Sequence, residues 1–393
     1  PGQADTTQTE KQTRKKDMDM PPVNILIKPS SGNCNLRCRY CFYCDEMEKR
    51  ETANYGFMSE ETLEILVKRV LEFADGSCGF AFQGGEPTLV GLDFYKRLLE
   101  YEQKYNIKNV PIHNSIQTNG YGLGEEWAEF LSQNHFLVGV SLDGIVHTHD
   151  AYRIHASGKG TFGEIMKTLE LFDRKKVEYN ILTVVNRRTA ERIGRIYDFY
   201  KKHNWHYLQF IACLDPLGET PGQREYSLTP EIYGEFLVKL FDLWYLDWQK
   251  GTQTSIRMFD NYIGILMGYT PEACDQRGCC SIQNVVEADG SVYPCDFYVI
   301  DQYRLGNIRE NSLEQLYEQG RELRFMEESL ENKEECRTCE YGYLCRGGCR
   351  RNRQLDETGR LGLNYFCPSY KMLFQAALPR MREIASWLRM RGR

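Results

Sequence analysis

Three cysteines near the start of the chain are spaced to bind a metal cluster. Cys34, Cys38 and Cys41 form a Cys-x₃-Cys-x₂-Cys motif shortly after an apolar run. Three thiolates can hold three irons of a four-iron cluster and leave the fourth iron open, which distinguishes a catalytic cluster from a closed electron carrier. The alternative is a zinc site with a distant fourth ligand. The spacing favours iron and sulfur.

Eight further cysteines gather toward the C-terminus. They divide into two sets of four, which suits two closed Cys₄ sites for iron–sulfur clusters, although two zinc ions would need the same number of ligands. Glycines lie among them, as expected where backbone wraps closely around a bulky group. The eight are Cys274, Cys280, Cys295, Cys336, Cys339, Cys345, Cys349 and Cys367.

Four of the 15 cysteines remain outside these sets. Cys78 and Cys213 adjoin apolar runs and are expected to be core residues. Cys44 closely follows the first motif and is expected to be a bystander. Cys279 is adjacent in sequence to Cys280 and could exchange with it.

Composition narrows the class of protein. The 393 residues predict one large domain and a smaller one, and the formal net charge of −6 argues against a chain built to coat nucleic acid or an anionic membrane. No apolar run approaches the roughly 18 residues of a membrane span. The basic N-terminal residues precede no apolar stretch, so we predict no signal peptide and a cytoplasmic protein.

Hydrophobic patterning predicts strands and helices that alternate from Val23 onward. Six such units in succession predict a parallel sheet, for which an open barrel is one solution, with functional loops at the C-terminal strand ends. The strands are expected at Val23–Lys28, Gly79–Gln83, Ile112–Gln117, Leu137–Leu142, Tyr179–Val185 and Leu208–Ala212. The helices are expected at Ser59–Ala74, Leu92–Tyr105, Glu125–Asn134, Gly163–Lys175, Thr189–His203 and Ser227–Trp248.

A change of composition beyond the last of these elements predicts a second domain. We divide the chain into a disordered leader, a barrel, a cysteine-rich domain and a C-terminal helix end with a solvated row of arginines. The four parts are 1–22, 23–255, 256–380 and 381–393.

These motifs resemble the radical S-adenosylmethionine superfamily. The resemblance rests on the first motif, which ends in Cys41-Phe42, and on Gly84-Gly85-Glu86-Pro87. The C-terminal cysteines resemble its SPASM extension, which holds two auxiliary [4Fe-4S] clusters. From Pro21 to about Arg380 the chain is similar to anaerobic sulfatase-maturating enzymes, including the segments 80–88, 289–298 and 345–351.

The resemblance implies an α/β fold, a partial (β/α)₆ TIM-like barrel followed by a Cys-rich SPASM domain. It implies three [4Fe-4S] clusters and S-adenosylmethionine as cofactors. One-electron cleavage of the cofactor gives a 5′-deoxyadenosyl radical, which removes a Cβ hydrogen from a Cys or Ser of a sulfatase. Loss of a second electron and a proton then leads to Cα-formylglycine.

The family's functional residues map onto positions of this chain. The general base falls on Asp296, whereas no role falls on Asp260. The cofactor contacts are Tyr40, Gly85, Ser141, Arg153 and Leu214. The open cluster belongs to Cys34, Cys38 and Cys41, the nearer auxiliary cluster to Cys274, Cys280, Cys295 and Cys349, and the farther one to Cys336, Cys339, Cys345 and Cys367.

The implied partners are a sulfatase with a Cys/Ser-x-Pro-x-Arg motif and an electron donor such as a ferredoxin or flavodoxin, with no nucleic acid and no membrane. Two alternatives stay open. One is a related enzyme that forms thioethers or epimerises residues in a ribosomally made peptide, although 22 polar residues cannot fold a leader-binding domain. The other is a ferredoxin-like carrier or a zinc protein, which needs no barrel for a substrate.

Overall fold

Six parallel strands form the centre of the protein, as the sequence predicts. The computed structural model describes residues 22–331, 334–355, 357 and 359–391, so all but the last residue of the predicted leader lies outside the described residues. Each strand pairs in parallel with the next, in sequence order. The strands are β1 (Val23–Ile27), β2 (Cys78–Phe82), β3 (Ile112–Thr118), β4 (Leu137–Ser141), β5 (Tyr179–Val185) and β6 (Tyr207–Ala212).

Four very short strands extend this sheet on both sides, so that it has ten strands within the described part of the chain. The strand β7 (Ser255–Ile256) pairs with β6, and β8 (Val285–Val286) pairs in parallel with β1. The strands β9 (Ser291–Tyr293) and β10 (Gly306–Asn307) follow in antiparallel fashion. The β1–β8 pairing fixes the cysteine-rich region beside the first strand of the barrel.

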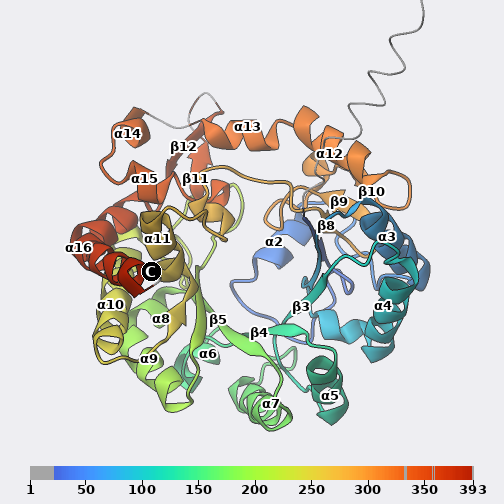
Figure 1. Ribbon diagram of the computed structural model, residues 1–393, viewed down its shortest axis with the longest axis horizontal. Coiled ribbons are helices and arrows are strands. Elements are labelled where there is room, and N and C mark those ends of the chain that lie inside the picture. Colours follow the sequence, from blue (N-terminus) through green and yellow to red (C-terminus); the bar gives the residue numbers. More distant parts are fainter. Residues whose placement is uncertain (1–21, 332–333, 356, 358, 392–393) are drawn as a thin grey trace, which may run out of the picture.

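Helices cover the outer side of the curved sheet (Figure 1). The long ones begin and end close to the predicted bounds, and the N-cap of α3 is Ser59, whose side chain accepts a hydrogen bond from the Thr62 N–H. The helical elements between β1 and β7 are α2 (Phe42–Glu48), which lies inside the ring in Figure 1, α3 (Glu60–Phe73), η1 (Pro87–Val90), α4 (Leu92–Tyr105), α5 (Glu125–Gln133), α6 (Val146–His149), α7 (Phe162–Lys175), α8 (Arg187–Glu191), α9 (Ile193–Lys202) and α10 (Pro230–Gln249).

The prediction of one continuous helix at Thr189–His203 is wrong. The structure divides it into α8 and α9 because Arg192, with φ −111° and ψ 13°, leaves the helical region. The side chain of Asn186 caps α8 by accepting a hydrogen bond from the Thr189 N–H. Asp260, to which the resemblance assigns no role, lies in the first turn of the helix α11 (Arg257–Met267).

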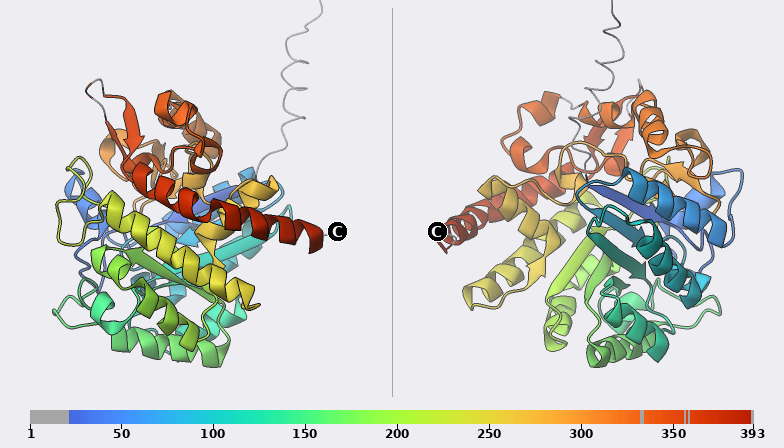
Figure 2. Two further views of the ribbon diagram at one scale, coloured as in Figure 1. Left: turned by 90° about the vertical axis from the view of Figure 1, so that its left-hand side faces the viewer. Right: turned by 45° about the vertical axis from the view of Figure 1, so that its right-hand side comes forward.

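The cysteine-rich region is built from short elements and one long helix. Along α10 lies α16, whose C-terminal end extends beyond the barrel (Figure 2). The remaining elements are η2 (Cys274–Gln276), η3 (Asp301–Tyr303), α12 (Leu313–Glu322), α13 (Phe325–Leu330), α14 (Glu334–Arg337), α15 (Gly342–Cys345), η4 (Arg350–Asn352), β11 (Arg353–Leu355), β12 (Leu361–Asn364) and α16 (Cys367–Arg391).

The predicted domain boundaries fall inside these elements. The boundary at 255/256 lies within β7, and the boundary at 380/381 lies within α16. The side chain of Arg380 is not simply solvated, because it forms an ion pair of 2.8 Å with Asp242 and lies over the Phe241 ring. The second domain therefore joins the barrel through a shared sheet and a shared helix layer.

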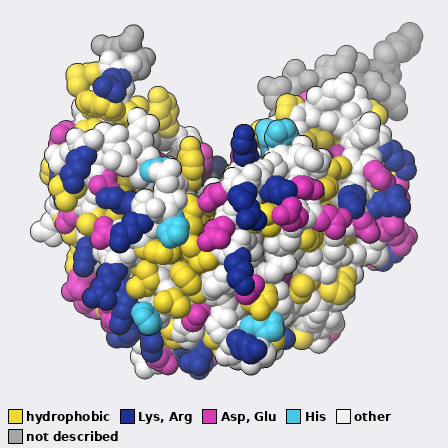
Figure 3. Space-filling view, turned by 90° about the horizontal axis from the view of Figure 1, so that it is seen from below, with side chains coloured by type: hydrophobic (Ala, Val, Ile, Leu, Met, Phe, Trp, Pro, Cys, Tyr) yellow, Lys and Arg dark blue, Asp and Glu magenta, His cyan; other side chains and the backbone are white. Residues whose placement is uncertain are grey.

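No helix in the described ranges is long and apolar enough to cross a membrane. The face seen in Figure 3 is hollowed between two lobes, and side chains of both charges are interspersed over it.

A buried carboxyl group on α4 makes stability depend on pH. Burial raises the pKa of Glu102 to about 7, while Asn114 donates one hydrogen bond of 3.2 Å to it. Because the folded-state pKa lies above the unfolded value of 4.5, the free energy of unfolding is highest at low pH and falls as the pH rises from that value through about 7. The full pKa shift corresponds to a loss of roughly 3 kcal/mol in the free energy of unfolding. Glu102→Gln should therefore melt above the wild type at pH 8 and close to it at pH 5, in anaerobic calorimetry. Glu100→Gln, an exposed carboxylate on the same helix, is the control and should show no such divergence.

Candidate active site

The first three cysteines lie on the loop that joins β1 to α2, at the C-terminal end of β1. A second segment, after α6, holds this loop by backbone hydrogen bonds. The Arg37 N–H donates to the Ile154 carbonyl at 2.7 Å, and the Arg39 N–H donates to the Tyr152 carbonyl at 3.0 Å. The loop is therefore fixed before any ligand binds.

Burial makes two of these thiols reluctant to ionise on their own. It raises the pKa of Cys34 to about 11, with a contribution from Glu86, and the pKa of Cys38 to about 12. A hydrogen bond with the Cys44 side chain lowers the pKa of Cys41 to about 6. Thiolates in such a site need a bound cation, and iron binding would release their protons.

Arg153 offers a buried positive charge beside this loop. It exposes only 7% of its surface, and its Nη1 donates a hydrogen bond of 3.2 Å to the Tyr40 hydroxyl. Tyr40 in turn donates to the buried Asp143 carboxylate. The Nε of Arg153 has no hydrogen-bond partner among the described residues. A buried guanidinium with a spare donor fits a carboxylate ligand, such as that of S-adenosylmethionine.

The backbone at Gly85 packs directly on the cysteine loop. Its N–H donates to the Ser31 carbonyl at 2.8 Å, and a Cβ built at this position would lie 2.2 Å from the Asn33 carbonyl oxygen. Any side chain would therefore push the loop away.

The other two predicted cofactor contacts lie at the same edge of the sheet. Ser141 is the last residue of β4, and its Oγ accepts a hydrogen bond of 3.0 Å from the Gln117 side chain. Leu214 follows β6 by two residues and is half-buried. All five predicted contacts thus come from segments at the C-terminal ends of the strands.

Glu86 connects this edge to the cysteine loop, a role that the sequence analysis missed. Its carboxylate is 1% exposed and accepts hydrogen bonds from the Thr118 hydroxyl at 2.7 Å and the Asn119 N–H at 2.8 Å. The Asn119 side chain donates to the Asn35 side chain, within the loop, at 2.7 Å. The signal was present in the sequence, since a carboxylate directly follows the two glycines.

Asp296 reaches the same edge from the cysteine-rich region. Its Oδ1 lies 2.5 Å from the Nζ of Lys28, and its Oδ2 accepts a hydrogen bond from the Gln83 side chain. Lys28 and Gln83 each directly follow a strand, β1 and β2 respectively. Lys28 is fully buried and lies 3.9 Å from the centre of the Tyr43 ring. Sequence reasoning named neither of these two partners, although a polar residue directly after a buried strand was a usable signal.

A second buried contact joins the two parts of the protein nearby. Arg50 follows α2, and Glu287 lies between β8 and β9. Their side chains form an ion pair of 2.9 Å in which neither is exposed, and Tyr43 also donates to Glu287. Arg50 further donates to the Ala53 carbonyl at 2.9 Å.

This buried pair gives a stability prediction. Glu287→Ala leaves the Arg50 charge buried without its partner and should lower the free energy of unfolding by about 3–5 kcal/mol. The exposed pair between Glu61 and Arg309, at 3.0 Å, also links α3 to the C-terminal region, so Glu61→Ala is the matched control and should cost less than about 1 kcal/mol. Anaerobic thermal unfolding measures both, and equal losses would contradict the prediction.

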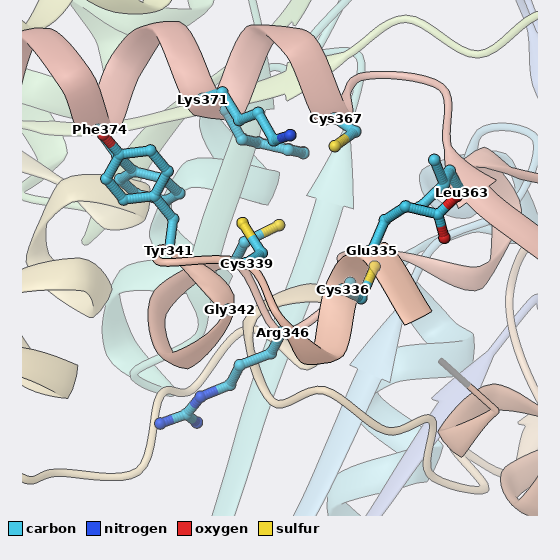
Figure 4. A pocket seen from close by; sticks show the side chains of 13 residues that line it. Glu335, Cys336, Cys339, Tyr341, Gly342, Arg346, Leu363, Cys367, Lys371 and Phe374 are labelled. Atoms are coloured by element: carbon cyan, nitrogen blue, oxygen red, sulfur yellow. The ribbon is translucent and has the colours of Figure 1, made fainter. Parts of the chain in front are cut away.

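Two cavities in the C-terminal region are each lined by four of the predicted ligands. The smaller cavity, of about 40 Å³, is lined by Cys274, Cys280, Cys295 and Cys349, and also by Cys279. The larger cavity, of about 150 Å³, is lined by Cys336, Cys339, Cys345 and Cys367. Figure 4 shows the sulfur atoms of Cys336, Cys339 and Cys367 turned toward one shared space.

The structure brings Cys349 away from its neighbours in sequence. It lines the smaller cavity although Cys345 lines the larger one. Burial raises the pKa of Cys349 to about 12, so its thiolate too needs a cation. Each set of four thiols therefore lines one cavity of its own.

Of the four cysteines outside the predicted ligand sets, Cys279 lines the smaller cavity, whereas Cys44, Cys78 and Cys213 line neither cavity. Cys78 and Cys213 are 1% and 4% exposed, which confirms them as core residues. Cys44 is exposed on α2 and close enough to Cys41 to share a hydrogen bond.

Comparison with protein-family models gives two matches. Residues 29–200 match the radical SAM superfamily, and residues 278–340 match SPASM, described as an iron–sulfur cluster-binding domain. The first match covers the three-cysteine loop and the strands β2 to β5, and the second includes Cys280, Cys295, Cys336 and Cys339, four of the eight predicted auxiliary ligands.

Curated relatives and solved structures extend the match to nearly the whole chain. A cysteine-type anaerobic sulfatase-maturating enzyme of Clostridium perfringens is 48% identical over 93% of this chain and 99% of its own length, and one of Clostridium novyi is 46% identical over 94% and 99%. A serine-type enzyme of Bacteroides thetaiotaomicron is 32% identical over 92% and 90%. A structure of native anSMEcpe with bound AdoMet and Cp18Cys peptide superposes with a TM-score of 0.89 at 48% identity, over 94% of this chain and all of that one.

A more distant structure, Streptococcus suis SuiB bound to precursor peptide SuiA, has a TM-score of 0.60 at 16% identity over 92% of this chain and 79% of that one. This likeness shows the fold alone. The full-length matches at high identity confirm the family that the cysteine motifs predicted. The chain belongs to the anaerobic sulfatase-maturating enzymes of the radical S-adenosylmethionine superfamily.

Proposed function

We propose that this enzyme oxidises a cysteine of a sulfatase to Cα-formylglycine. The observation that carries the proposal is the position of Asp296, a carboxylate from the cysteine-rich region held by Lys28 and Gln83 at the edge of the barrel that also bears the three-cysteine loop. The cofactors are three [4Fe-4S] clusters and S-adenosylmethionine, which together supply a 5′-deoxyadenosyl radical and accept an electron.

Cys34, Cys38 and Cys41 would hold the open cluster. Arg153, oriented by Tyr40, would pair with the carboxylate of S-adenosylmethionine through its spare donor. Gly85 would let the backbone approach the methionine, Ser141 would bond a ribose hydroxyl, and Leu214 would pack against the cofactor.

Asp296 would act as the general base. Oxidation of the substrate cysteine removes one Cβ hydrogen atom, one electron and the thiol proton, which leaves a thioaldehyde that water hydrolyses to the aldehyde with release of hydrogen sulfide. The thiol proton needs an acceptor within hydrogen-bond reach. One carboxylate oxygen of Asp296 forms an ion pair with Lys28 and the other accepts a hydrogen bond from Gln83, so the orientation of the carboxylate is fixed before substrate binds. Lys28 and Gln83 therefore serve as positioning residues.

The four thiols around each cavity would hold the auxiliary clusters. Cys274, Cys280, Cys295 and Cys349 would bind the nearer one, and Cys336, Cys339, Cys345 and Cys367 the farther one. Because Cys295 directly precedes Asp296, the nearer site adjoins the base. Proton and electron would then leave the substrate toward neighbouring residues of one loop.

We infer a preference for cysteine over serine, since the cysteine-type relatives are 48% and 46% identical and the serine-type relative is 32% identical. The substrate motif would be Cys-x-Pro-x-Arg. The enzyme would work in the cytoplasm, before the sulfatase folds around that motif, with an electron donor of the ferredoxin or flavodoxin kind.

Mass spectrometry of a peptide tests the proposal. A peptide with the Cys-x-Pro-x-Arg motif, incubated anaerobically with enzyme, S-adenosylmethionine and dithionite, should show conversion of the thiol to an aldehyde that reacts with a hydrazine probe. The matched serine peptide should react more slowly, and the alanine peptide not at all. Cofactor cleavage with an unchanged cysteine peptide, or with a thioether crosslink in it, would contradict the proposal.

A further inference from the structure

The outer side of the three-cysteine loop carries several basic residues, and the nearest carboxylates in sequence, Asp45 and Asp150, lie directly beyond its two segments. It consists of residues 34–44 and residues 151–160, which pair through backbone hydrogen bonds and a bridge between Leu36 and His155. Neither segment contains an Asp or a Glu.

Three exposed cations lie on these segments: Arg37, Arg39 and Lys159. We name them the cluster-loop face. Arg37 donates to the carbonyls of Cys34 and Leu36, at 2.6 and 2.8 Å, so no carboxylate offsets its charge. In the part of the chain that the structure describes, the side chains of Arg39 and Lys159 form no ion pair.

The neighbouring α8 region adds charge of both signs. Arg188 forms an ion pair of 2.9 Å with Glu225, and Arg192 one of 3.4 Å with Glu191. These pairs are neutral overall, so the positive excess stays on the cluster-loop face. By contrast, the larger cysteine cavity has Glu335 as well as Lys371 and Arg346 at its lining, so the signs are mixed there.

Only a thin layer of protein separates this face from the cluster ligands. Tyr152, whose carbonyl accepts the Arg39 N–H, is 1% exposed and packs beside Cys38 in one apolar group. The Tyr152 ring lies 6.3 Å from the Tyr40 ring, and the Arg188 guanidinium lies 5.4 Å from the centre of the Tyr152 ring. An electron carrier on this face would thus approach within one aromatic layer of the first cluster.

We propose that the cluster-loop face docks an acidic one-electron carrier protein, which reduces the first cluster. This inference rests on the proposed function, because only an enzyme with that cluster needs the electron. In the transfer the carrier loses one electron and the oxidised cluster gains that electron, with no proton moved. A flavin carrier would pass from the anionic hydroquinone to the neutral semiquinone. Charge complementarity would act mainly on the rate of association and weaken with salt.

Charge reversal with two reductants tests the docking. Arg39→Glu/Lys159→Glu should lower the rate of 5′-deoxyadenosine formation about tenfold or more with limiting reduced acidic flavodoxin at low salt, because the attraction becomes repulsion. With saturating dithionite, a small reductant, the rate should match that of the wild type. A second arm replaces flavodoxin by an acidic ferredoxin and should respond in the same way.

The matched control is Lys176→Glu/Lys202→Glu. These exposed lysines lie at the C-terminal ends of α7 and α9, the opposite end of the barrel, and the change of net charge is the same. The control should keep both rates. Wild-type turnover with either carrier should also fall as sodium chloride is raised, whereas the dithionite rate should not.

The outcomes separate docking from chemistry. An unchanged carrier-driven rate in the variant, or an equal loss in the control, overturns the docking proposal. An equal loss of the carrier-driven and the dithionite-driven rates also overturns it, since the substitutions then act on the cluster itself. Arg39→Gln/Lys159→Gln, measured in the same salt series, repeats the test in a milder variant. If the wild type cleaves the cofactor but leaves the cysteine peptide unchanged, the proposed function fails, whatever the docking result.

Discussion

Replacing Cys34, Cys38 and Cys41 together with alanine is expected to abolish formation of 5′-deoxyadenosine. The three thiols lie on one loop, and burial raises the pKa of two of them, so their thiolates exist only with a bound cation. Without them no open iron remains to bind S-adenosylmethionine beside Arg153. Anaerobic chromatography of the nucleoside product measures the loss, which should reach the background of enzyme-free samples.

Iron analysis of the same variant tests whether the three sites are separate. The wild type should carry about twelve irons per chain and the variant about eight, because the two C-terminal cavities have their own four thiols. Cys44→Ser, which changes the neighbouring thiol on α2 but retains a hydroxyl donor toward Cys41, is the control and should keep all twelve. A triple variant with twelve irons, or one that still cleaves the cofactor, would show that other residues hold the first cluster.

The regular part of the fold could be predicted because its signal is local. Strands of five to seven residues with alternating burial, such as β5, and helices with a capped start, such as α3, are visible in the sequence. The strands β7 to β10 are two or three residues long, too short for any periodicity. Their place in the sheet follows from pairing with distant segments, which only the folded chain brings together.

The candidate site shows the same division. Cysteine spacing predicts which residues bind iron, since ligands of one cluster are often close in the chain. It cannot by itself place Cys349 with the smaller cavity, because that choice depends on the turn between α15 and Cys349, where Arg346, Gly347 and Gly348 all have positive φ. Likewise, the contact between Gln83 and Asp296 spans 213 positions in the sequence, and no local pattern predicts it.

Asp296→Asn is expected to separate cleavage of the cofactor from oxidation of the substrate. The asparagine keeps the size of the side chain but cannot take a proton from the substrate thiol, so formylglycine should fall by about 100-fold or more. Its amide nitrogen would also face a donor, either Lys28 or Gln83, at one of the two positions that now hold carboxylate oxygens. Formation of 5′-deoxyadenosine should persist, since Cys34, Cys38, Cys41 and Arg153 are untouched.

The ratio of the two products is therefore the decisive measurement. Asp260→Asn removes an exposed carboxylate of the same region, one that accepts a hydrogen bond of 2.5 Å from Ser255, and it should leave that ratio unchanged. If both variants lose formylglycine, the loss reflects damage to the C-terminal region. If Asp296→Asn makes formylglycine in full yield, another group accepts the proton, and Lys28 and Gln83 then hold a carboxylate whose task is to join the cysteine-rich region to the barrel.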